Sequence, residues 1–250
     1  MNSYRESHIR TEVADRYDQF FENRVDSLIW DRFVKPWIHG VLESVEEQGA
    51  GSYLDFACGT GRILKQGART FEKPTGIDIS ENMLATAKMR VPNAVLHCLD
   101  VTKQDSEHIG RFDCVSMFRF LRNAEPELRK DVLDWIWRHT KEGGILIVNN
   151  HGHSSSISGL IQRLAFWLPP SRRALLSRKQ MYRLMEQSGF TVLECRGFQV
   201  LPGVFGRPIL GRWLQEIAER ALLRLGLGRF GYELVVVAQR TGTGEVDVNR

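Results

Sequence analysis

SYLDFACGTGRIL, residues 52 to 64, is the stretch that decides the fold. Apolar residues lead up to the carboxylate of Asp55, and Gly59 and Gly61 follow within six residues. A short strand that ends in a glycine-rich turn and continues into a helix is typical of the ligand-binding crevice of a parallel sheet. Glycines in that turn let backbone amides approach a ligand closely, and the N-terminus of the next helix favours a carboxylate or a phosphate.

Helix-like and strand-like segments alternate over the first 150 residues. An amphipathic opening at residues 12 to 45 predicts a helix that Pro36 interrupts. Short apolar runs predict further strands at residues 74–80, 94–101, 112–118 and 144–150, and amphipathic runs predict helices at 81–91 and 126–140. The alternation predicts an α/β protein with a parallel sheet covered on both faces.

Length and composition limit the function classes. The chain has 250 residues, of which 42% are hydrophobic, and this predicts one domain with inserts. Every long apolar run is interrupted before about 18 residues, which excludes a membrane span, and the polar N-terminus does not fit a signal peptide, so we expect a cytoplasmic protein.

Charge is distributed unevenly. Residues 151 to 232 hold twelve Lys or Arg and four acids, although the net charge of the chain is only +4. Such an excess predicts either a surface that meets nucleic acid, phosphorylated molecules or lipid headgroups, or a merely solvated basic face.

Two cofactor classes use such a glycine-rich turn. A dinucleotide fingerprint requires a third glycine where this chain has Leu64, so a nicotinamide cofactor is disfavoured. The residues LDFACGTGR resemble instead the first motif of the class I S-adenosylmethionine (SAM)-dependent methyltransferases, with Ala57 in place of the first glycine. GIDISENML resembles their second motif, CLDVT their third and FDCVSMFRFLRN their fourth, all in the family's order.

This resemblance implies a cofactor and its ligands. SAM would bind and S-adenosylhomocysteine (SAH) would be the product. Asp78 would accept hydrogen bonds from both ribose hydroxyls, Asp100 would lie near the adenine edge, and Tyr17, in the segment ADRYDQFF, would face the methionine end. The implied cofactor-binding residues are Tyr17, Asp55, Ala57, Gly59, Thr60, Gly61, Asp78, Ile79, Met83, Asp100, Val101 and Phe118.

Each carboxylate also has an ordinary structural interpretation. Asp55 could cap the next helix, Asp78 could bind turn amides, and Asp100 could pair with a surface base. Three such coincidences at consecutive strand ends are improbable together.

The resemblance also implies the architecture: a three-layer α/β sandwich around a mostly parallel seven-stranded sheet whose last strand is antiparallel, plus helical lid inserts. We expect one domain over residues 1–250, with an N-terminal helical cap at 1–50, a SAM-binding core at 51–150 and lid inserts at 151–176 and 202–230. The inserts mix Leu, Ile, Phe and Trp with Arg at helical spacing. They could line an apolar substrate pocket, pack as core, or lie on a membrane and serve a glycolipid or polyprenyl-linked acceptor.

Candidate catalytic residues follow the fifth predicted strand. NNHGHS contains His151 and His153, whose neutral imidazoles suit a general base for a hydroxyl or ammonium acceptor. The pair could alternatively hold a metal, but no acidic partner lies at ligand spacing, so no metal site is predicted. Residues expected to bind the substrate are Arg119, Arg122, Asn150, Phe166, Trp167 and Trp213.

These observations predict an enzyme that methylates an oxygen, in preference to a nitrogen, of a small-molecule, glycan or lipid-linked acceptor in biosynthesis. An RNA methyltransferase is a second hypothesis, but the fourth motif lacks the Asn/Asp-Pro-Pro-aromatic pattern of enzymes that methylate base amines, and nucleic acid is not an expected partner. An inactive SAM-binding protein is a third hypothesis, and the intact residues Asp55, Gly59, Gly61 and Asp78 disfavour it.

Overall fold

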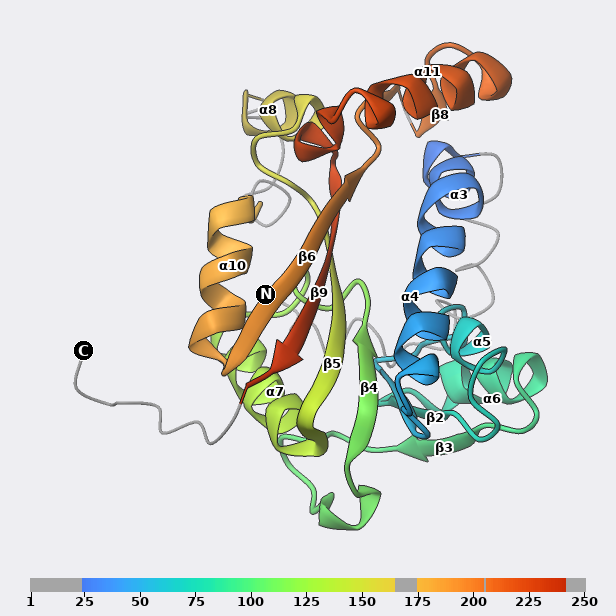
Figure 1. The fold of residues 1–250 in the computed structure, drawn as a ribbon, viewed down its shortest axis with the longest axis vertical. Coiled ribbons are helices and arrows are strands. Elements are labelled where there is room, and N and C mark those ends of the chain that lie inside the picture. The colour runs from blue at the N-terminus through green and yellow to red at the C-terminus, as the bar shows by residue number, and fades with distance from the viewer. Residues whose placement is uncertain (1–23, 165–174, 205, 242–250) are drawn as a thin grey trace.

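The structure is a computed structural model that describes residues 24–164, 175–204 and 206–241. Its main sheet has seven strands in the order β3-β2-β1-β4-β5-β9-β6 (Figure 1). The strands of this sheet are β1 (Tyr53–Phe56), β2 (Thr75–Asp78), β3 (Val95–Cys98), β4 (Phe112–Met117), β5 (Thr140–His151), β6 (Phe190–Phe198) and β9 (Glu233–Arg240). A separate two-stranded ribbon pairs β7 (Gly203–Val204) with β8 (Arg207–Pro208).

The topology confirms the predicted fold class. Strands β1 to β5 pair in parallel, and β9 inserts antiparallel between β5 and β6. In this register His151 at the end of β5 lies opposite Glu233 at the start of β9. The antiparallel insertion therefore brings the start of the last strand to the carboxyl ends of the parallel strands.

Helices cover both faces of the sheet (Figure 1). The helical elements are α3 (Val25–Ile29), η1 (Trp30–Val34), α4 (Lys35–Glu47), α5 (Leu64–Gly67), α6 (Glu81–Arg90), η2 (Glu107–Ile109), α7 (Pro126–His139), α8 (Ile157–Leu164), α10 (Arg178–Gln187), α11 (Arg212–Arg224) and η3 (Leu227–Phe230). Ile38 and Leu42 of α4 join a core cluster with Tyr53 of β1, whereas Leu133 of α7 and Met185 of α10 belong to a second cluster. Two cores thus hold the sheet from opposite sides.

The prediction that Pro36 interrupts the first helix is wrong, because the helical segments follow one another without a break. The helix continues from Val25 to Glu47, and residues Trp30–Val34 form a π-helical turn directly before Lys35 and Pro36. Proline lacks the N–H that an α-helix would use, and a wider turn accommodates this without ending the helix. The continuous helix delivers Arg24 to the carboxyl end of the sheet.

The helix after β2 begins where the sequence predicts. Ser80 is its N-cap, and the Ser80 hydroxyl accepts a hydrogen bond from the backbone N–H of Met83. Because the cap fixes the turn between β2 and α6, it also fixes the carboxylate of Asp78 two residues earlier.

Helices α8 and α11 both lie at the end of the molecule toward which β5 runs (Figure 1). The buried side chains of α11 are polar, namely Gln215 and Glu219, whereas its apolar residues Trp213, Leu214 and Ile217 are exposed. None of the helices in the described ranges has the length and apolar character that a membrane span requires.

Candidate active site

The turn after β1 has an unusual backbone. Ala57, Gly59 and Gly61 all have positive φ angles, of 54°, 53° and 79°. A side chain at Gly61 would meet Ala87 of α6 at 3.1 Å, so this glycine lets α6 pack closely. A Cβ at Gly59 would meet nothing within 4 Å, so the turn leaves open space there.

The carboxylate of Asp78 holds this turn. Its Oδ2 accepts the backbone N–H of Gly59 at 2.9 Å, and its Oδ1 accepts that of Ser80 at 3.0 Å. A carboxylate has about four acceptor positions, so these two bonds do not by themselves fill it. The structural role is therefore compatible with the ribose-binding role that the sequence predicts.

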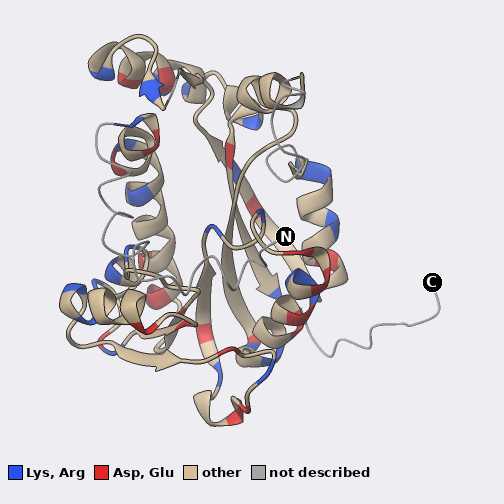
Figure 2. Cartoon of the chain, turned by 180° about the vertical axis from the view of Figure 1, so that it is seen from behind, with Lys and Arg blue, Asp and Glu red and all other residues tan. Residues whose placement is uncertain are grey.

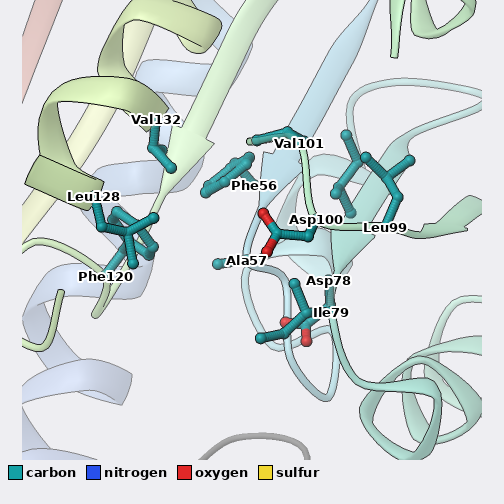
Figure 3. A pocket seen from close by; sticks show the side chains of 11 residues that line it. Phe56, Ala57, Asp78, Ile79, Leu99, Asp100, Val101, Phe120, Leu128 and Val132 are labelled. Carbon is teal, nitrogen blue, oxygen red and sulfur yellow. The ribbon is translucent and has the colours of Figure 1, made fainter. Parts of the chain in front are cut away.

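An apolar slot lies between the ends of β1, β2 and β3 on one side and α7 on the other (Figure 3). It measures about 470 Å³ with its open mouth. The labelled side chains in Figure 3 put Phe120, Leu128 and Val132 across from Ile79 and Leu99. The slot also includes Asp78, Asp100 and Val101, three of the residues that the sequence analysis expects to bind the cofactor. Apolar walls with acidic groups at the edge suit a flat heteroaromatic ring joined to a hydroxylated sugar.

A second cavity, the turn hollow, lies on the other side of Ala57. It measures about 360 Å³ with its mouth, and its lining includes Asp55, Gly59, Thr60, Phe118 and Arg119. Ala57 lines both this hollow and the apolar slot, so the two are neighbours.

Asp55 is the buried acid of the turn hollow. Its Oδ1 accepts the hydroxyl hydrogen of Ser116 at 2.6 Å, and Ser116 is also bonded to the hydroxyl of Tyr53 at 2.6 Å. Its Oδ2 is buried and has no hydrogen-bond partner among the described residues. Burial raises the pKa of Asp55 to about 7, although the hydrogen bond from Ser116 lowers it in part. An orphaned acceptor at this place fits the ammonium of a SAM molecule.

We expect Asp55→Asn to stabilise the ligand-free protein above neutral pH. The native state keeps a proton on Asp55 that the unfolded chain has released, so the free energy of unfolding falls as pH rises from about 4 to 7. At pH 8 the charged form costs the native state up to ~4 kcal/mol, and asparagine removes that cost.

Urea unfolding at pH 5 and at pH 8 measures this effect. Asp134→Asn, an exposed change on α7, is the control and should keep the pH dependence of the parent protein. An Asp55→Asn variant with an unaltered pH dependence would show that Asp55 is ionised throughout.

A third and larger cavity, the arginine hollow, measures about 970 Å³ with its mouth. Its polar lining comes from the start of α3, the loop after β4, the end of β5, α8, the connection after β6 and the start of β9. The polar residues are Arg24, Asp26, Arg119, Arg122, His151, Ser158, Gln162, Gln199, Tyr232 and Glu233. Arg119 lines both this hollow and the turn hollow, so the three cavities form a row.

His151 lies in the wall of the arginine hollow. Its side chain is half-buried, and its Nδ1 is buried with no hydrogen-bond partner in the described part of the chain. Burial lowers the pKa of His151 well below its ordinary value, and the positive charges of Arg119, Arg122 and Arg62 lower it further. His151 is therefore neutral at pH 7, the form in which an imidazole accepts a proton.

The other residues of NNHGHS do not share this position. His153 is buried outside the lining, where its Nδ1 lies 3.2 Å from the carbonyl oxygen of Gly231. Asn150 is also fully buried, and its amide donates to the carbonyls of Gly152 and Leu176. Both side chains anchor the chain after β5, so the structure brings His151 alone of the two histidines to the hollow.

Two further predicted residues lie outside the three cavities, and three others are not described. Met83 is buried in α6 and lines none of the three cavities. Trp213 is 72% exposed on α11 and lies outside the arginine hollow. Tyr17, Phe166 and Trp167 fall outside the described residues. No group of three potential metal ligands occurs within the described ranges.

The sequence analysis missed several lining residues. Tyr232 and Glu233 could have been predicted, because a last strand inserted antiparallel beside β5 must begin next to the end of β5. Arg24 and Gln162 have no such signal in the sequence, because helix periodicity does not tell which neighbour a helix end will contact. Phe120 and Leu128 are indistinguishable in the sequence from ordinary core residues.

Comparison with known proteins agrees with this geometry. The family described as "Methyltransferase domain" matches residues 54–144. A putative methyltransferase of Geobacillus sp. (strain WCH70) is 32% identical over 127 residues, 49% of each chain. The dTDP-3-amino-3,4,6-trideoxy-alpha-D-glucopyranose N,N-dimethyltransferase of Streptomyces venezuelae is 37% identical over 103 residues, 40% of this chain and 42% of that one. The chain thus spans about half or less of the length of these relatives.

A solved structure extends the likeness over nearly the whole chain. Magnesium protoporphyrin IX methyltransferase from Synechocystis PCC 6803, with bound SAH, aligns with a TM-score of 0.67 over 95% of this chain and 98% of that one, at 15% identity. At this identity the likeness shows a shared fold. This chain thus shares the fold of that SAH-bound methyltransferase, and its residues 54–144 match the methyltransferase domain family.

Proposed function

We propose that this chain transfers a methyl group from SAM to an oxygen of a small-molecule acceptor held in the arginine hollow. The observation that supports this is the row of three cavities. The apolar slot and turn hollow share Ala57, and the turn hollow and arginine hollow share Arg119. A cofactor lying along the first two would present its methyl group toward the third.

Each residue has a distinct task in this proposal. When bound, SAM supplies a methyl group on a sulfonium, an electrophile ready for in-line displacement. Asp78 accepts bonds from the ribose hydroxyls, Asp55 accepts from the ammonium, and the apolar slot with Asp100 holds the adenine. His151 takes the proton of the acceptor hydroxyl as the new carbon–oxygen bond forms and the carbon–sulfur bond breaks.

A nitrogen acceptor is the second candidate. The Streptomyces venezuelae relative is named as an N,N-dimethyltransferase of an amino sugar, and a neutral imidazole can also take a proton from an ammonium. Small polar molecules, glycans and lipid-linked sugars all contain suitable hydroxyl or amino groups.

Calorimetric titration with SAM and SAH is the first test of the proposal. We expect one site per chain, with both compounds bound. A folded protein that binds neither compound would overturn the proposed function.

We also propose that the inserts at 151–176 and 202–230 form a lid over the acceptor and that α11 rests on a membrane at its cytoplasmic face. The buried Glu219 accepts the backbone N–H groups of Val200 and Leu201, so the polar face of α11 is used to hold the connection after β6. Its apolar face points outward, and Arg212, Arg220 and Arg224 occur along the same helix (Figure 2). An anionic lipid surface complements this combination of apolar and basic groups.

Trp213→Ala together with Leu214→Ala should reduce sedimentation with anionic liposomes. These side chains are 72% and 50% exposed, so removing them leaves the core intact. A fully buried side chain of this size contributes about 1.5 to 3 kcal/mol, and we expect at least a tenfold loss of liposome binding. Added salt should weaken binding by the parent protein, because it screens the arginines.

Leu193→Ala is the matched control, because Leu193 is 56% exposed on β6, away from α11. Equal liposome binding by all the variants would refute the membrane proposal. A concentration-dependent dimer that the double variant abolishes would instead assign this face to a second copy of the chain.

A further inference from the structure

The exposed apolar side chains of the described residues are concentrated in two segments. Of the fourteen large apolar side chains that are exposed, eleven belong to residues 157–164 and 209–230. The other three, Met89, Val95 and Leu193, are spread over α6, β3 and β6. Helices α8 and α11 carry most of the eleven, and both lie at the same end of the molecule (Figure 1). Because single exposed apolar side chains are normal and large clusters are not, this apolar end is a contact surface.

Helix α8 turns polar side chains toward the protein and apolar ones away from it. Ser158 and Gln162, four residues apart, line the arginine hollow, and the Gln162 amide donates to the Tyr232 hydroxyl at 2.8 Å. Four exposed residues at intervals of three and four positions form an apolar stripe on this helix: Ile157, Leu160, Ile161 and Leu164. This spacing places them on one side of a helix, so the stripe is continuous.

Hydrogen bonds hold α11 in a similar orientation, with its apolar side outward. The amide oxygen of the buried Gln215 accepts the backbone N–H of Ile209 at 3.0 Å, and its nitrogen donates to the carbonyl of Pro202 at 3.4 Å. Glu219, also buried, holds the connection after β6 in the same way. These bonds satisfy the buried polar groups, so the outward position of Trp213 is part of the fold.

The charge of the apolar end complements an anionic lipid surface. Glu216 is the only acid of residues 207–230 that is not buried, and it pairs with Arg32 at 3.2 Å and with Arg220 at 3.0 Å. Four exposed arginines of this segment form no ion pair with any described residue: Arg207, Arg212, Arg224 and Arg229. A second copy of the chain would bring like charges together, whereas anionic lipid headgroups would attract them.

The elements of the apolar end also border the arginine hollow. Ile161 lines the hollow and is 57% exposed, so the apolar stripe of α8 reaches the rim. Pro202 and Gly203 form another part of the lining, and they belong to the connection that Gln215 holds. A molecule with its polar part in the hollow beside His151 can therefore extend an apolar part along α8 to the outer surface.

We propose that the methyl acceptor is a lipid, anchored in the membrane by an apolar chain, whose polar headgroup enters the arginine hollow. The inference rests on the proposed function and names the acceptor class. Helices α8 and α11 lie together on the membrane, with their apolar side chains below the lipid headgroups and the arginines among them. The apolar chain of the acceptor then stays in contact with apolar groups while its headgroup reaches His151, which avoids the cost of exposing the chain to water.

Sedimentation with vesicles of phosphatidylcholine and phosphatidylglycerol, without SAM, tests the surface. Leu160→Ser combined with Leu164→Ser removes two exposed side chains of α8 that do not line the hollow. We expect this double variant to bind the vesicles about tenfold more weakly than the parent chain, or weaker still. Met89→Ser combined with Leu193→Ser, similarly exposed on α6 and β6, is the matched control and should bind as the parent chain does.

Methyl transfer to the two phases of one cell extract tests the acceptor class. The lipid phase is supplied in the same vesicles and the water-soluble phase in buffer, each with SAM that carries a ¹³C methyl group. We expect labelled product in the lipid phase. Its yield should fall with the α8 double variant and stay unchanged with the control, and equal SAH affinity of both variants would show that their fold is intact.

Vesicle binding by the α8 double variant that equals that of the parent chain would overturn the inference. A chain that binds SAM and labels only water-soluble molecules, or labels no lipid, would overturn it as well. Failure of the proposed function has a different signature, because calorimetry would then show no binding of SAM or SAH. Vesicle binding is measured without cofactor, so it tests the surface in either case.

Discussion

Replacing His151 with glutamine will lower the rate of methyl transfer about 100-fold or more, because the acceptor hydroxyl then loses its general base. SAH affinity should stay within about twofold, since His151 lines the arginine hollow and neither of the cavities that we assign to the cofactor. Single-turnover rates and calorimetry on the same preparation separate the two effects.

The pH dependence of the parent enzyme provides a second check on His151. Its depressed pKa keeps the imidazole unprotonated at neutral pH. As pH is lowered, kcat/KM should therefore begin to fall only well below pH 6.5.

Two controls accompany the His151 variant. His108→Gln changes an exposed histidine in η2 and should leave the rate unchanged. His153→Gln removes the contact with the Gly231 carbonyl, so it should lower the stability of the fold more than the chemical step. Normal turnover by His151→Gln would mean that the base lies elsewhere or is unnecessary.

Asp78→Ala should weaken SAM binding about 10- to 150-fold, because a charged acceptor of hydrogen bonds contributes about 1.5 to 3 kcal/mol. The same carboxylate accepts the amides of Gly59 and Ser80, so the variant also loosens the turn that borders the cofactor. Loss of the ribose contact and loss of support for the turn both weaken SAM binding.

Asp78→Asn distinguishes the two contributions. The asparagine side chain keeps one carbonyl oxygen, so it should retain part of the support for the turn and lose the second acceptor. Asp134→Ala, an exposed acid on α7, is the control for a change of net charge. Unchanged SAM affinity in folded Asp78→Ala would exclude the crevice at β1 and β2 as the cofactor site.

The sequence predicted those parts of the fold that are determined by residues close together in the chain. The glycine turn, the carboxylate at the end of β2 and the N-cap at Ser80 each depend on neighbours in the chain. The parallel sheet follows from the alternation of strands and helices, whereas the antiparallel last strand is implied by the family resemblance. The widened helical turn before Pro36 was missed, because proline is usually accommodated by ending a helix.

The acceptor side was less predictable, because strand geometry and packing decide it. Successive side chains of a strand point to opposite faces, so Asn150 faces away from Asn149 and His151. The strand ends at His151, and the chain then turns His153 into the interior. On α11 an apolar stripe suggested a pocket wall, but the buried face of this helix is made by Gln215 and Glu219.

Transfer of a labelled methyl group tests the central claim most directly. The purified chain is incubated with SAM carrying a ¹³C methyl group and with metabolite and lipid extracts, and labelled products are identified by mass spectrometry and NMR. We predict a product that has gained the mass of one labelled methylene, with the carbon shift of an O-methyl group, and little product with His151→Gln. Tight SAM binding without labelled product from any extract would contradict the account.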